Sequence, residues 1–187
     1  MTTNSMETKG MKTKFLLLAL CSLGSLATAA EAPSYRNDLL TIPMGAVVNG
    51  TEAKYYKDIV LQSDSTGKFR IVSAVARPLV HVDNVNPVAT ETQDSRSAEV
   101  NISGYKSVPC TKLEDVAVTR KDNVFTILLA ESVMGPAETC IAIIDPFTVK
   151  VPLDVRGLPA GTYKLNVNGV QSSFTLTRNP RAAGKLR

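Results

Sequence analysis

Residues 146–176 read PFTVKVPLDVRGLPAGTYKLNVNGVQSSFTL, and this stretch decides the fold class. Apolar side chains recur at every second position in three runs, at residues 149–155, 163–167 and 174–176. A period of two is typical of a strand with one face on a core. Between the runs stand GLPAG and NG, whose glycines and asparagine tolerate the positive φ of tight hairpins. The stretch therefore predicts a β-meander within an all-β protein.

The rest of the chain also consists of short apolar alternations bounded by Gly, Pro, Asn, Asp and Ser, without helical periodicity. We expect two β segments. A small N-terminal β-meander covers residues 35–76, with strands at 39–42, 55–61 and 69–73. Three strands are near the lower limit for independent stability, so this segment is expected to dock on the rest.

The second segment covers residues 99–177 and is expected to form a sandwich of the immunoglobulin or fibronectin type. Seven short strands over such a length are typical of that architecture. Pro78, Pro87 and a polar run predict a linker or long loop over residues 77–98. The predicted strands of the second segment are 100–102, 116–119, 124–129, 141–144, 149–155, 162–167 and 173–177.

The sequence LPAGTY ending at Tyr163 resembles the tyrosine corner of fibronectin-type and immunoglobulin-like domains. The resemblance implies that the Tyr163 hydroxyl bonds to backbone just upstream. Gly161, Asn168 and Gly169 are assigned structural roles in the adjoining turns. The alternative for Tyr163 is an ordinary half-buried strand tyrosine.

Several short stretches together resemble uncharacterised bacterial secreted or periplasmic proteins: LLTIP (39–43), YKDIVL (56–61), GKF (67–69), GLPAGTY (157–163) and VNG (167–169). This resemblance covers about half of the chain that follows residue 30. It implies a fold, and it brings no catalytic residue with it.

Residues 1–30 are predicted to be a cleaved signal peptide. Lys12 and Lys14 precede a short apolar region, and Ala27-Thr28-Ala29 fits the small-x-small rule for cleavage. Residues 1–10 precede Met11 and are interpreted as an over-extended start. The apolar region is too short to span a membrane, so we expect no integral span and an exported protein, periplasmic or extracellular.

Without residues 1–30, two cysteines remain, Cys110 and Cys140. An even pair in an exported chain favours a disulfide. The alternatives are a metal-binding pair or a redox-active pair, although redox work favours the Cys-x-x-Cys spacing that this chain lacks.

The formal net charge is +4, and it falls to +2 once three lysines and one glutamate leave with residues 1–30. Four of the remaining cations lie in the basic tail, residues 178–187, so the body before it carries about −2. The basic character belongs to the two ends, and we expect no nucleic-acid partner.

Catalytic chemistry is poorly supported. The chain has one histidine, His81, and no Gly-x-Ser-x-Gly elbow, which argues against a serine triad. Glu114 and Asp115 are adjacent, so in an extended chain their carboxylates point to opposite faces. We therefore predict no catalytic residue, no metal site and no cofactor.

The leading functional hypothesis is an exported, non-catalytic β-sandwich protein that binds a protein or an envelope polymer. A second hypothesis is an inhibitor of a secreted hydrolase, with residues 85–98 or 131–139 inserted into an enzyme cleft. A purely structural envelope protein and a carboxylate-based hydrolase are the remaining alternatives.

Overall fold

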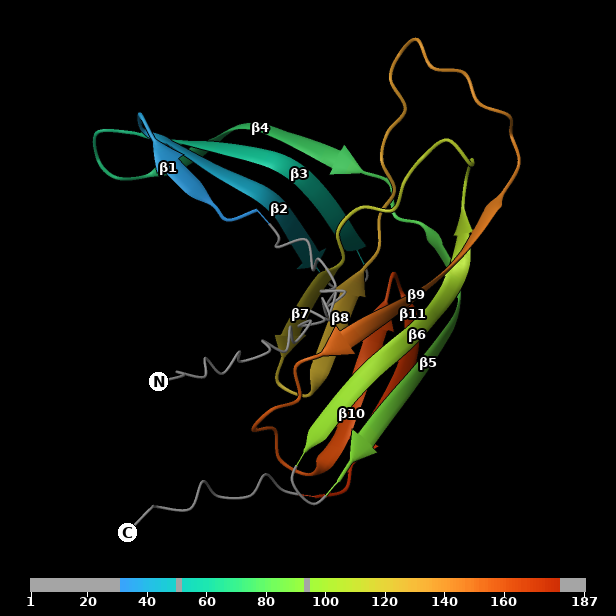
Figure 1. The fold of residues 1–187 in the computed structure, drawn as a ribbon. Helices are drawn as coiled ribbons and strands as arrows, with labels where there is room; N and C mark the ends of the chain where they lie inside the picture. Colours follow the sequence, from blue (N-terminus) through green and yellow to red (C-terminus); the bar gives the residue numbers. More distant parts are fainter. Residues whose placement is uncertain (1–30, 50–51, 93–94, 179–187) are drawn as a thin grey trace, which may run out of the picture.

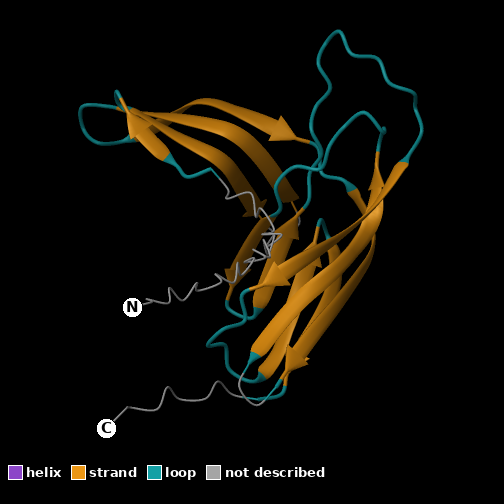
Figure 2. Ribbon diagram, viewed as in Figure 1, coloured by secondary structure: helices purple, strands orange, loops and turns teal. Residues whose placement is uncertain are grey.

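The computed structural model describes residues 31–49, 52–92 and 95–178, and in this part of the chain it has eleven strands and no helix (Figures 1 and 2). The all-β prediction is confirmed. The predicted signal peptide and nearly all of the basic tail lie outside the described residues. The strands are β1 (Ser34–Arg36), β2 (Leu39–Asn49), β3 (Glu52–Ser63), β4 (Phe69–Arg77), β5 (His81–Glu91), β6 (Arg96–Lys106), β7 (Ala117–Lys121), β8 (Val124–Leu128), β9 (Asp145–Leu153), β10 (Gly161–Val167) and β11 (Val170–Leu176).

The N-terminal segment is an antiparallel sheet of four strands in the order β1-β2-β3-β4. The sequence analysis missed β1, which has only three residues. The signal lies in Asn37-Asp38, which connects β1 to β2 with φ values of 51° and 60°. Two consecutive residues with positive φ form the turn that favours hairpins, and Asn and Asp tolerate that conformation.

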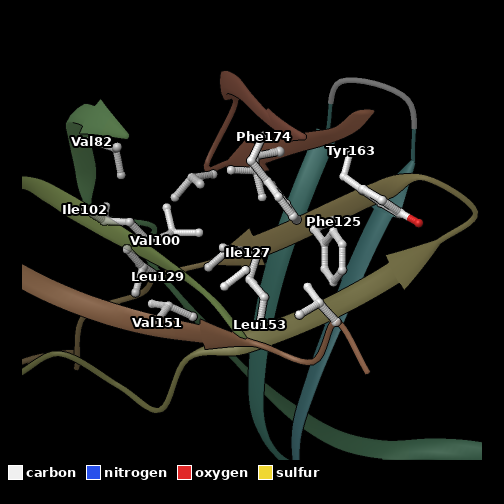
Figure 3. Close-up of a cluster of buried hydrophobic side chains, with 14 of the residues drawn as sticks. Val82, Val100, Ile102, Phe125, Ile127, Leu129, Val151, Leu153, Tyr163 and Phe174 are labelled. Carbon is white, nitrogen blue, oxygen red and sulfur yellow. The ribbon is translucent and has the colours of Figure 1, made fainter. Parts of the chain in front are cut away.

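The remaining seven strands form two facing sheets, β5-β6-β9 and β11-β10-β8-β7. All pairs are antiparallel except β8 with β10, which run parallel. Alternate residues of β6, β9, β10 and β11 are buried or half-buried over most of each strand, as their period of two requires. Their inward side chains pack against those of β8 in one hydrophobic core. Figure 3 shows this core between the strands. Its members include Val100, Ile102, Phe125, Ile127, Leu129, Val151, Leu153, Tyr163, Leu165, Val167, Phe174 and Leu176.

The structure differs from the sequence analysis over residues 77–98, which were expected to form a linker. They contain β5 and the start of β6, so the sandwich begins near His81 rather than at residue 99, and residues 85–98 are not the long loop of the inhibitor hypothesis. A register shift between Val82 and Asn84 interrupts the apolar alternation. β5 is also an edge strand, where Pro87 is tolerated because the outward side needs no ladder hydrogen bond.

Residues 141–144 differ in the opposite sense, because the predicted strand is absent there. The sandwich nevertheless has the expected number of seven strands, because it includes β5, which was not predicted, and lacks the strand that was expected at 141–144.

The N-terminal sheet docks on the sandwich through Tyr55, as expected from its small size. Tyr55 is fully buried with Ala117, Leu128 and Ala130 in a second apolar cluster. Its hydroxyl donates to the carbonyl of Asp115 at 2.8 Å. Burial of an apolar ring with a satisfied hydroxyl joins the two parts at a specific position.

Candidate interaction surfaces

The only histidine of the sequence, His81, lies at the start of β5 and is exposed to solvent. The His81 side chain is 55% exposed, its Nε2 lies 3.2 Å from Asp83, and its ring stacks on Tyr105 at 4.5 Å. Among residues 31–49, 52–92 and 95–178 no three His, Cys, Asp or Glu side chains gather as metal ligands would. The contacts of His81 are those of a surface residue packed on a neighbouring ring.

The adjacent carboxylates Glu114 and Asp115 lie at the junction of the N-terminal sheet and the sandwich. Glu114 accepts from the Lys57 ammonium at 3.0 Å and from the Arg77 guanidinium at 2.9 Å. Asp115 lies 3.5 Å from the same ammonium. The hydrogen bond that Lys57 donates to Glu114 raises the pKa of Lys57, and burial raises the pKa of Tyr55 to about 12. Both carboxylates serve the docking contact.

Cys110 and Cys140 form a disulfide that closes a segment with a sequence separation of 30, which confirms the predicted bridge. The bridge attaches Cys110 to the long connection between β8 and β9, residues 129–144, which contains Cys140. Figure 1 shows the outer part of this connection projecting from one end of the sandwich. We call residues 133–144 the tethered loop.

A buried polar cluster anchors the connection where it leaves and re-enters the sandwich. Glu131 is buried and accepts from the hydroxyls of Ser107 at 2.8 Å and Thr111 at 2.5 Å. Lys106 is also buried; its ammonium donates to the Thr111 carbonyl and lies 2.8 Å from Asp145, the first residue of β9. Buried charges of this kind are stable only when their hydrogen-bonding capacity is met. The sequence carried no signal for this cluster.

The tethered loop exposes large aliphatic side chains. Ile141, Ile143 and Ile144 are 64%, 58% and 62% exposed, and Val133 on the same loop is 57% exposed. Sequence reasoning missed this surface because four apolar residues in a row were interpreted as a strand. Their lack of a period-two pattern is the signal that distinguishes them from the neighbouring strands.

A second apolar surface lies on the N-terminal sheet. Cross-strand pairing places Tyr35, Leu40, Leu61 and Ile71 in one row across all four strands. Tyr35 also meets the edge of Phe69, with ring centroids 6.4 Å apart. On β4, four large apolar side chains are exposed: Phe69, Ile71, Val72 and Val75.

The residues assigned structural roles lie in or beside β10 of the sandwich. The Tyr163 hydroxyl donates to the Pro159 carbonyl at 2.9 Å, the upstream backbone contact that the tyrosine-corner resemblance implies. Gly161 and Gly169 have φ values of 155° and 96°. The structure brings none of these residues to either apolar surface.

Asn168 does more than form a turn. With φ 47°, it begins the two-residue connection between β10 and β11. Its amide nitrogen donates to the carbonyls of Val80 and Leu129, and its side-chain oxygen accepts from the Leu129 backbone. One side chain thus joins segments from both sheets at this end of the sandwich.

Comparison with known proteins bears on the sandwich alone. Residues 100–176 match the model of a family described as the ORF11 beta-sandwich domain, in agreement with the two facing sheets. None of the curated proteins and none of the solved structures matches the chain. In the described ranges no helix has the length and apolar character needed to cross a membrane. The chain is therefore similar to a β-sandwich family from β6 to β11.

Proposed function

We propose that this is an exported, non-catalytic binding protein whose tethered loop recognises a protein partner. One observation carries the proposal: three isoleucines are exposed by 58–64% on a loop anchored by a disulfide and a buried polar cluster. Exposed aliphatic groups normally cost solubility, so a cluster of them favours an interaction site.

The restraint at the base of the loop supports a role of its exposed side chains in recognition. Ordering a loop on binding costs affinity, and a loop already restrained at its base loses less freedom. Cys140 directly precedes Ile141, and the Lys106–Asp145 pair directly follows Ile144. The apolar segment is therefore restrained immediately before and immediately after its exposed residues.

The apolar character of the loop favours a protein partner over a charged polymer. Residues 141–144 carry no charge, and a polyanionic or polycationic polymer would require charges that this surface does not offer. The disulfide supports export, because such bonds persist in oxidising compartments.

The test is affinity capture from the envelope and culture supernatant of the source organism, with residues 31–187 as bait and the disulfide intact. We expect one stoichiometric partner with the wild-type bait and a loss of it with Ile143→Lys. Val88→Lys is the matched control, because Val88 is an exposed aliphatic residue on β5 and faces Glu99 on β6. Capture of the same amount of partner by the Ile143→Lys and Val88→Lys baits would contradict the proposal.

The identity of the partner then distinguishes a binding protein from an inhibitor. A captured hydrolase that loses activity in the complex would favour the inhibitor hypothesis, in which residues 131–139 were expected to enter an enzyme cleft. This segment lies outside the named strands and is exposed at Val133 and at residues 136–139, whereas most of residues 85–98 lie in β5 and β6. Failure to capture any protein would favour a structural role.

A further inference from the structure

The outer edge of the N-terminal sheet is a long strand without the usual protection. β4 is the last strand in the order β1-β2-β3-β4, and Figure 1 shows it at the rim of this sheet. Its nine residues, FRIVSAVAR, include no proline and no lysine. The opposite edge, β1, has three residues. Short edges and edge lysines or prolines are common means of preventing further pairing, and β4 uses none of these.

The strand is regular enough to pair. Its ladder with β3 has the same register at both ends of β4, at residues 75–77 and 69–71, and register shifts flank the Val60–Ser73 pair between them. The four exposed apolar side chains of β4 point to both faces, because Val72 alternates with Ile71 and Ser73 along the strand. An edge that is apolar on both faces is suited to pairing with another apolar strand.

We propose that β4 pairs antiparallel with β4 of a second copy of this chain, about a twofold axis at Ser73. In that register Ile71 faces Val75 of the second copy, and Val72 faces its Ala74. Both contacts occur twice, as a twofold interface requires. The two four-stranded sheets then join into one sheet of eight strands.

The charges of β4 favour a second copy as the occupant. Its two cations, Arg70 and Arg77, stand three residues before and four residues after Ser73. Pairing about Ser73 therefore places Arg70 opposite Ala76, and Arg77 opposite Phe69, with no arginine facing an arginine. Like charges directly opposite would destabilise the pair, and this register avoids them.

The row of apolar side chains on one face would also continue across the new interface. Tyr35, Leu40, Leu61 and Ile71 form this row within one copy. In the proposed register it extends to Val75 of the second copy. The exposed end of the row at Ile71, which is 68% exposed, would then have an apolar neighbour.

The first measurement is the mass of residues 31–187 by sedimentation equilibrium over a range of concentrations, with the native disulfide intact. We expect reversible dimerisation. Ile71→Lys and Val75→Glu should each weaken the dimer by roughly a hundredfold, because each places two charges against apolar side chains. A protein that stays monomeric at its highest soluble concentration would overturn the proposal.

The decisive control is to mix the two variants. In a heterodimer of Ile71→Lys with Val75→Glu, the new cation faces the new anion at one site, and Ile71 faces Val75 at the other. We expect the mixture to dimerise although each variant alone is mostly monomeric. Dimerisation that neither substitution weakens, or a mixture that stays monomeric, would refute this register.

A second, independent readout traps the interface covalently. Two Ser73 residues face each other across the axis, at a backbone separation that a disulfide can bridge. Ser73→Cys should therefore give a covalent dimer under mild oxidation, whereas Ser173→Cys, on the exposed side of β11, should not. Equal cross-linking of both would count against the proposal. Neither experiment involves the tethered loop, so the outcome is independent of the proposed function.

Discussion

Removal of the Cys110–Cys140 bridge should destabilise the protein and also disable its tethered loop. The perturbation is the double substitution Cys110→Ser and Cys140→Ser, which deletes the cross-link and leaves two small polar side chains. The bridge closes a segment with a sequence separation of 30. On the chain-entropy relation, a loop of this size restricts the unfolded chain by about 3.5 kcal/mol at 25 °C.

The assay is urea unfolding followed by far-ultraviolet circular dichroism, because the chain has no tryptophan. We expect the free energy of unfolding to fall by about 3 kcal/mol, a large share of the stability of an ordinary domain. Wild-type protein treated with a reductant is the control for the serine side chains. A fall below about 1 kcal/mol would refute the reasoning that the bridge restrains a long unfolded segment.

The same variant separates stability from recognition. The Glu131 cluster still anchors the base of the connection without the bridge. We therefore expect the folded fraction to keep its strand content and to lose partner affinity, because Ile141 to Ile144 are no longer restrained by Cys140. Unchanged capture by the folded variant would show that the restraint contributes nothing to binding.

Three further substitutions test the junction and the packing. Because burial raises the pKa of Tyr55 from 10 to about 12, the folded protein keeps its phenol protonated where the unfolded chain ionises. The unfolding free energy should therefore fall by about 1.4 kcal/mol per pH unit between those values, and Tyr55→Phe should remove that slope in pH-dependent urea titrations. Asn168→Gly keeps the turn conformation but loses the side-chain hydrogen bonds to Leu129, so calorimetry should record a loss of about 2 kcal/mol in the free energy of unfolding. A loss of less than about 0.5 kcal/mol would contradict the bridging role of this side chain. Gly104→Ala would place a methyl group 2.0 Å from the His81 carbonyl, so β5 must shift, and a melting temperature equal to wild type would disprove the close contact.

The sandwich was predictable where local chemistry and periodicity agree. Asn168-Gly169 predicted the last hairpin, and alternation in residues 149–176 predicted the core faces of β9 to β11. The disulfide followed from parity of the cysteines. These features depend on neighbours in the chain, which a sequence displays directly.

The remaining features depend on contacts between distant segments. β5 was missed because a register shift and Pro87 break its pattern, and its pairing with the adjacent strand β6 is not visible in the local pattern. The isoleucines at 141–144 have strong strand propensity but no partner strand in the part of the chain that the structure describes, and propensity alone does not form a ladder. The roles of Glu131 and Glu114 are set by cations and hydroxyls 20 or more residues away.

The central claim is that the tethered loop contacts a protein partner, and site-specific photocross-linking tests it most directly. A photoreactive phenylalanine analogue at Ile143, in protein exported by the source organism, should yield one discrete adduct on irradiation. The same analogue at Val88, on the exposed face of β5, should yield none. Adducts of equal intensity at both positions, or none at Ile143, would contradict recognition by this loop.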